Sequence, residues 1–445
     1  MAKKAGSQRR KRTVSTTATP DHTVARVSMW GKPVGAVSED RTGRIVFEYE
    51  ESFRSSGLEI SPLRLPLATR GPVEFPELRR TVAFAGLPGV LADALPDAFG
   101  NAVIRRYFEE RGTPDAALSP VQKLLYIGSR AMGALEFSPP IDRALNWATD
   151  EAIVIARLVA EARRVIEGDT SYAVPEMMQV GASAGGARAK ALVLWNPATD
   201  RLKSAFAPRA SGDEHWLVKF DGVTAGTGGP TLREDVRPGP FGRIEYVYSQ
   251  LAAAAGVEMA ATRLLRDGDL AHFMTKRFDR AGDDRFHMHT LGGLHHVDYN
   301  VRGVFSYEEL FRTIRELELG QAAVDQAFRR MVFNIAAVNQ DDHVKNFAFL
   351  MGPSGEWALA PAFDVTFAHG NVWTRTHQMT LGGKDDDFTR DDLLRVGAMM
   401  DVARDGAEIL NEVESALGLW EPEAVDAGIP RRWIREISGL FRHFA

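Results

Sequence analysis

The sequence predicts an α+β protein, with strands concentrated toward the N-terminus and helices toward the C-terminus. Alternating apolar residues separated by Gly- and Asp-containing turns indicate short antiparallel strands at 24–30, 34–37 and 45–49. Apolar residues at three- and four-residue intervals predict a buried helix over 321–338. A dense polar stretch follows that helix directly, at 339–346. We therefore expect a sheet-containing N-terminal part, a helical C-terminal part and a functional loop within the latter.

Length and composition restrict the class of protein. The 445 residues suffice for two or three domains with their own cores. The net charge of −5 argues against a protein-wide nucleic-acid footprint but leaves a local patch open. The absence of cysteine excludes disulfides and cysteine metal sites. No apolar run is long enough to cross a membrane, and the basic N-terminus lacks the apolar stretch of a secretory signal. We expect a soluble, cytoplasmic protein.

The polar stretch 339–346 lies between a predicted core helix and a predicted strand. Polar groups in such a place are costly unless they meet a ligand or each other. Phosphoryl transfer needs a carboxylate to orient a hydroxyl, an Asn five residues later, and a second Asp beyond a short strand pair. Asp341, Asn346 and Asp364 have this spacing. Asp and Asn are also common at helix N-caps, but the three together favour a magnesium site at Asn346 and Asp364.

Two further stretches suit a nucleotide. Lys219 lies in an apolar strand, 214–220, where kinases carry a lysine that contacts the α- and β-phosphates. An edge-strand lysine that reaches water is the alternative. Glu245, near the start of the next helix, either pairs with Lys219 or is an ordinary first-turn glutamate. The run 180–190 is rich in Gly and Ala, so its backbone N–H groups can approach phosphates, although a flexible hairpin has the same composition.

The motif Asp341-Asp342-His343-Val344-Lys345-Asn346, followed by Pro361-Ala362-Phe363-Asp364, resembles the HipA family of serine/threonine-kinase toxins from bacterial toxin–antitoxin pairs. The resemblance covers roughly residues 24–440 and includes a Leu95-Pro96-Asp97 stretch before a helix. It implies a HipA-like, protein-kinase-like two-lobe fold. Its four parts would be a disordered basic tail (1–22), a HipA-type N-terminal subdomain (23–168), a nucleotide-binding region (169–280) and a helical lobe with the catalytic loop (281–445).

The resemblance also implies roles for single residues. ATP would lie beneath the loop of Gly185 and Gly186, and Ser183 would be autophosphorylated, which would expel the loop and disable the enzyme. Backbone groups of Lys276 and Phe278 would contact adenine, with Lys276 standing where relatives usually have Glu. The remaining predicted roles are hydroxyl orientation by Asp341, stabilisation of the transferring phosphoryl by His343 and Lys345, phosphate contact by Lys219, and Mg²⁺ binding by Asn346 and Asp364.

The implied partners are a protein substrate with Ser or Thr and a helix-turn-helix, HipB-like antitoxin, with DNA contacted only through the antitoxin and no membrane. Two other functions remain open: a kinase for a lipid or small molecule, and a non-enzymatic co-repressor acting with the antitoxin. Four closely spaced histidines, at 287, 289, 295 and 296, invite a metal interpretation. Without cysteine or a nearby carboxylate triad we expect no metal there. We further expect a strand ending at 84–86, a helix over 149–168 and a loop at 421–428.

Overall fold

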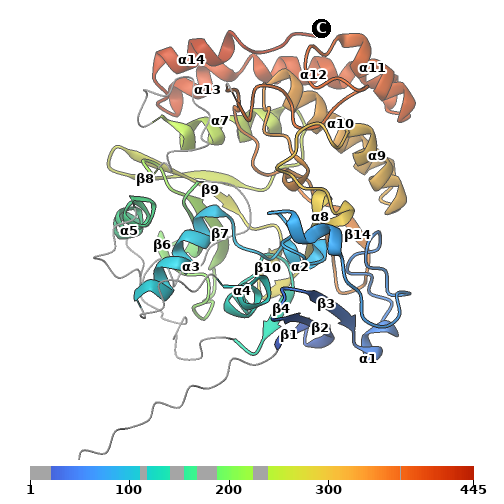
Figure 1. Ribbon diagram of the computed structural model, residues 1–445. Coiled ribbons are helices and arrows are strands. Elements are labelled where there is room, and N and C mark those ends of the chain that lie inside the picture. Colours follow the sequence, from blue (N-terminus) through green and yellow to red (C-terminus); the bar gives the residue numbers. More distant parts are fainter. Residues whose placement is uncertain are drawn as a thin grey trace, which may run out of the picture.

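A computed structural model of the protein describes residues 22–110, 118–140, 155–167, 188–223, 239–370 and 372–444. The predicted tail up to residue 21 and the loop residues Ser183, Gly185 and Gly186 lie outside these ranges. Helices α9 to α14 gather at one end of the molecule, and the N-terminal sheet lies at the other end (Figure 1). The predicted combination of N-terminal sheets with a helical C-terminal part is thus observed.

The N-terminal sheet is antiparallel, with strand order β3-β2-β1-β4. Its sequence alternates as predicted, so that Ala25, Val27 and Met29 of β1 all point into one core. Gly31 makes the tight turn into β2 at φ +73°, a conformation that favours glycine. The elements of this part are β1 (His22–Met29), β2 (Lys32–Asp40), β3 (Ile45–Tyr49), α1 (Glu51–Arg54), a 3-10 turn (Pro76–Arg80), α2 (Gly89–Ala92), α4 (Pro120–Ile127) and β4 (Leu135–Ser138).

The strand expected to end at 84–86 is absent, and this prediction was wrong. Ala85 and Gly86 have φ values of 50° and 89°. Extended strands require negative φ, so these residues form a turn instead. The apolar side chains of this stretch still contribute to the N-terminal core, in which Phe84 and Leu87 are both buried.

The second large sheet is antiparallel and has five strands in the order β6-β5-β7-β9-β8. Its middle strand, β7, carries Lys219. Helices α3 and α5 cover one face of it and share a core with β5 and β7, and α7 packs against β9. The described part of the helix predicted over 149–168 is α5. The elements are α3 (Ala98–Glu110), α5 (Ile155–Glu167), β5 (Lys190–Asn196), β6 (Arg201–Ser204), β7 (Glu214–Lys219), α7 (Phe241–Ala254), β8 (Thr262–Asp267) and β9 (Leu270–Lys276).

The C-terminal part surrounds the largest core, and α10 is buried along most of its length. A three-stranded sheet, β12-β13-β14, joins it to the N-terminal part. None of the helices within the described ranges is long and apolar enough to cross a membrane. The elements are β10 (Arg280–Ala281), β11 (Asp284–Arg285), β12 (His287–Thr290), α8 (Leu291–His295), α9 (Tyr307–Glu316), α10 (Gln321–Ala336), β13 (Ala348–Met351), β14 (Trp357–Leu359), α11 (Arg390–Met399), α12 (Ala407–Leu417), α13 (Trp420–Asp426) and α14 (Arg431–Ser438).

The loop expected at 421–428 is also wrong, because helix α13 occupies most of that stretch. Pro422 does not prevent the helix, because it lies in the first turn, where the backbone N–H has no helical partner to lose. Burial of Trp420 and Ala424 at a four-residue interval then stabilises the helix against the core.

Candidate active site

The predicted catalytic loop begins where α10 ends. Val338 has a φ of 56°, a strained conformation for a β-branched residue, and it turns the chain sharply out of the helix. The backbone N–H of Gln340 then donates to the carbonyl of Ala368 at 2.9 Å. Asn346 closes the loop, since its side-chain amide donates to the carbonyl of Asp341 at 2.8 Å. The five-residue spacing seen in the sequence therefore corresponds to a direct contact.

The two consecutive aspartates of this loop have different environments. Asp342 is buried and accepts from the Tyr307 hydroxyl at 2.6 Å and the Gln378 backbone N–H at 2.7 Å, with His377 Nδ1 2.8 Å away. Burial opposes its ionisation, but His377, Tyr307 and Gln378 together keep the pKa of Asp342 below its ordinary value. Asp341 has a side chain that is 36% exposed and can meet a substrate.

Lys219 lies at the centre of a buried charge network. Its Nζ is 2.5 Å from Glu245 Oε1 and also contacts Asp364 Oδ1. Arg188 reaches the second oxygen of Glu245 at 3.0 Å. Burial lowers the pKa of Lys219, but Asp364 and Glu245 outweigh it and hold that pKa above its ordinary value. Lys219 is only 7% exposed and lies in an inner strand, so it is not an edge-strand lysine, and Glu245 is its partner.

Asp364 follows β14 and has a φ of 56°, which Asp tolerates better than most residues. Together with Asn346 it lines a cavity that also contains Lys219. Burial alone would raise the pKa of Asp364, but Lys219 and Lys190 outweigh it and keep that pKa well below its ordinary value. An ionised carboxylate and an amide oxygen on one wall suit Mg²⁺, which prefers oxygen ligands. The residues present therefore fit the magnesium ion expected from the sequence.

The cavity lies between the five-stranded sheet and the catalytic loop. It is open to solvent on one side and is lined by both apolar and charged side chains, as ligand pockets are. Lys276 and Phe278 line it, as do Phe363 and Lys345. The N–H of Lys276 donates to the carbonyl of Ala261 at 2.8 Å, so this N–H is not free to contact a ligand. The Lys276 ammonium lies 2.6 Å from Glu214.

Comparison with known proteins decides the family. The HipA-like C-terminal domain matches residues 182–420, and the HipA N-terminal domain matches residues 25–138. The chain belongs to the HipA family. It is thus a serine/threonine protein kinase of the HipA toxin type, and the kinase family implies ATP as phosphate donor. A search of curated proteins found no match.

One solved structure shows the same fold for this HipA-family chain. The HipA chain of a Shewanella oneidensis MR-1 HipA, HipB and operator DNA complex matches at a TM-score of 0.58 and 17% identity, covering 93% of this chain and 96% of that one. The Helicobacter pylori proinflammatory kinase CtkA matches at a TM-score of 0.32 and 13% identity, covering 58% of this chain and 90% of that one. The first match confirms the predicted HipA-like α+β fold.

His343 lies beside Asp341, and both His343 and Lys345 lie near the ring of Tyr299 in this HipA-family chain. His343 Nε2 is 3.9 Å from Asp341 Oδ1, and the His343 ring is 5.2 Å from that of Tyr299. Lys345 Nζ lies 5.1 Å from the same Tyr299 ring, close enough for a cation–π contact. Burial lowers the pKa of Lys345, although Asp93 and Asp97 oppose that shift. The sequence did not single out Tyr299, because an isolated tyrosine has no spacing signal.

The N-terminal part of this HipA-family chain contributes to the cavity, which the sequence did not predict. Val90, Asp93 and Ala94 form part of its lining. Asp97 Oδ2 lies 2.8 Å from the ammonium of Lys190, and both side chains are 3% exposed. The sequence marks Leu95-Pro96-Asp97 as part of the family resemblance. Nothing in the sequence shows that Asp97 faces Lys190.

Three of the four histidines, His287, His289 and His296, contact the N-terminal part of the chain, and His295 contacts helix α9. His287 Nε2 is 2.8 Å from the carbonyl of Ile60. His289 lies between Ser61 at 3.0 Å and Asp93 at 2.6 Å. His296 accepts from the backbone N–H of Gly89 at 3.0 Å, and His295 is 2.7 Å from the Thr313 hydroxyl. Within the described ranges no group of three or more His, Cys, Asp or Glu could hold a metal ion.

Proposed function

We propose that this HipA-family kinase transfers the γ-phosphoryl group of ATP to a Ser or Thr hydroxyl of a protein target, with Mg²⁺. The observation that carries the proposal is the convergence of Lys219, Asn346 and Asp364 on one cavity, with Asp341 hydrogen-bonded to Asn346. Phosphoryl transfer depends chiefly on positioning and charge stabilisation, and these residues provide both.

In the proposed reaction the substrate hydroxyl oxygen attacks the γ-phosphorus. The bond from that phosphorus to the β–γ bridging oxygen breaks, ADP leaves, and the hydroxyl proton passes to the carboxylate of Asp341. Burial raises the pKa of Asp341 despite the opposing effects of His343 and Trp373, and a higher pKa strengthens a general base. Lys219 opposes the negative charge of the phosphates. Mg²⁺, held by Asn346 and Asp364, would neutralise charge on the transferred group when bound.

We extend the proposal to regulation and partners. Gly185 and Gly186 would belong to a loop that covers the nucleotide. Autophosphorylation of Ser183 in the same loop would expel the loop and switch the enzyme off. Backbone groups of Lys276 and Phe278 would contact adenine, and His343 and Lys345 would stabilise the transferring phosphoryl. A helix-turn-helix, HipB-like antitoxin would bind the chain in the cytoplasm and connect it to DNA. The four parts 1–22, 23–168, 169–280 and 281–445 would be its functional units.

The test is phosphate transfer by Asp341→Asn. This variant keeps the shape of the side chain but removes its basic charge, so transfer should fall by ~100- to ~10,000-fold while ATP binding stays close to wild type. Labelled ATP with the purified chain, alone and with a protein extract, measures transfer, and calorimetry measures binding. The matched control is Asp325→Asn on α10, outside the cavity. Transfer at the wild-type rate by Asp341→Asn would reject the assigned role.

A further inference from the structure

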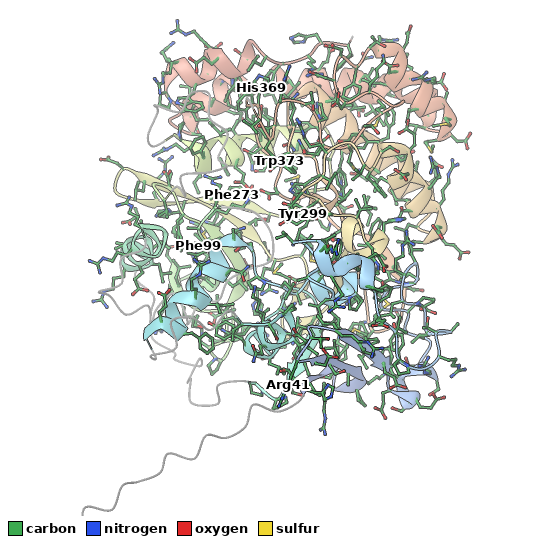
Figure 2. All side chains as sticks on the ribbon, in the orientation of Figure 1. Arg41, Phe99, Phe273, Tyr299, His369 and Trp373 are labelled. Carbon is green, nitrogen blue, oxygen red and sulfur yellow. The ribbon has the colours of Figure 1, made fainter. Side chains whose placement is uncertain are left out.

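We propose that Trp373 is a positioning residue for the general base, because its indole N–H holds the Asp341 carboxylate in the orientation that receives the hydroxyl proton. The inference rests on the proposed function of Asp341. Trp373 lies 32 positions along the chain from Asp341 and far outside the catalytic motif. Figure 2 places Trp373 in the middle of the molecule, between the C-terminal helices and the N-terminal sheets.

The contact itself is specific to one oxygen. Trp373 Nε1 donates to Asp341 Oδ1 at 2.8 Å. His343 Nε2 lies 3.9 Å from the same oxygen, beyond hydrogen-bonding distance. No side chain or backbone group within the described ranges donates to Oδ2. The indole therefore fixes the rotation of the carboxylate and leaves its second oxygen open to the substrate.

The segment that carries Trp373 is held by the neighbouring aspartate. Asp342 accepts from the backbone N–H of Gln378 at 2.7 Å. The side-chain amide of Gln378 in turn donates to the carbonyls of Trp373 at 2.8 Å, Thr376 at 3.1 Å and Gln340 at 3.0 Å. Asp342 thus anchors the segment 373–378, and that segment positions Asp341. The two consecutive aspartates thus have different roles. Asp342 holds the segment 373–378, and Asp341 can meet the substrate.

An indole at this position suits the task. Trp373 is partly exposed, so water could satisfy its N–H, yet the N–H is directed to the carboxylate. Hydrogen bonds to an ionised acceptor are shorter and stronger than neutral ones. Trp has a donor and no acceptor, so it cannot compete with Asp341 for the substrate proton. General-base catalysis depends on such alignment, because small misplacements of a reacting group lower the rate strongly.

The decisive experiment compares Trp373→Phe with Asp341→Asn and the double variant, each in the full chain. Phe keeps a large ring but removes the donor, so kcat for phosphate transfer from Mg-ATP should fall by ~10- to ~100-fold. The KM for ATP should stay unchanged, because Trp373 does not line the nucleotide cavity. Adding Trp373→Phe to Asp341→Asn should cost nothing further, because the donor then has no carboxylate to orient.

Trp357→Phe is the matched control. Its indole N–H is buried and has no hydrogen-bond partner among the described residues, so the same chemical change there should leave kcat unaltered. The inference is overturned if Trp373→Phe transfers phosphate at the wild-type rate while Asp341→Asn is impaired. It is equally overturned if the two substitutions lower kcat additively, since Trp373 would then act independently of Asp341. Activity of Asp341→Asn at the wild-type rate would instead reject the proposed function itself.

Discussion

Replacing Lys219 with Met should separate the two roles of its ammonium group, which are folding and phosphate binding. Glu245 is 1% exposed and lies 2.5 Å from this ammonium. Removing one partner of a buried pair leaves the other charge uncompensated and typically costs about 3–5 kcal/mol. Arg188, 3.0 Å from Glu245, remains in place in the variant. We therefore expect the free energy of unfolding to fall by an amount near the lower end of that range. The affinity for ATP should fall strongly as well.

Lys219→Met leaves two carboxylates without their cation, Glu245 and Asp364, and Glu245 is the more deeply buried of the two. Adding Glu245→Gln removes that buried charge while keeping the shape of the side chain. The double variant should recover part of the lost stability, because Glu245 no longer carries an unpaired charge while Asp364 still does. It should not recover ATP affinity, since the cation that meets the phosphates is still missing. Stability and binding should thus respond in different ways to the second substitution.

Urea unfolding followed by circular dichroism measures the first quantity, and calorimetric titration with Mg-ATP measures the second. The control is Arg315→Met, which breaks a pair with Asp401 in which both side chains are exposed, 47% for Arg315 and 84% for Asp401. Exposed pairs contribute about 0–1 kcal/mol, so this variant should behave almost as wild type. The reasoning is refuted if Lys219→Met is as stable as the control, or if the double variant binds ATP as tightly as wild type.

Three further predictions concern the same site. Asp364→Ala should abolish magnesium-dependent transfer and lower the stability without unfolding the protein, because Lys219 loses one partner but keeps Glu245; near-wild-type transfer would disprove the metal assignment. Ser183→Ala should escape self-inactivation, because a phosphate adds nearly two negative charges beside ATP; mass spectrometry should find phosphate on Ser183 only when Asp341 is intact. Burial raises the pKa of Asp341, so transfer should decline on acidification with a midpoint above 3.8, the ordinary value. The pKa of Asp341 is higher in the folded than in the unfolded protein, so ionisation of Asp341 disfavours the fold. As the pH rises through the pKa of the unfolded state, Asp341→Asn should therefore become more stable relative to wild type. Urea unfolding at several pH values measures this difference.

Local patterns in the sequence were sufficient for most of the fold. The helix predicted over 321–338, observed as α10 at Gln321–Ala336, and the strand at 45–49 follow from the spacing of apolar residues, which depends only on the geometry of one element. The spacing of Asp341 and Asn346 is equally local, and it corresponds to a hydrogen bond in the structure. Local patterns were wrong at 84–86 and 421–428, where backbone conformation and tertiary burial outweighed composition.

Contacts between distant segments could be decided only by the tertiary structure. Glu245 was either a partner of Lys219 or a first-turn residue, and the packing of α7 against β9, the neighbour of β7, makes it the partner. Asp341 and Asp342 are adjacent and chemically identical in the sequence. They differ because Tyr307 and Gln378 surround one of them, while Trp373 reaches the other. Apolar spacing is a property of a single element, whereas a charge or hydrogen-bond partner depends on which surfaces meet. The sequence therefore determined the elements and the residue types of the site, and the tertiary structure assigned each residue its neighbour.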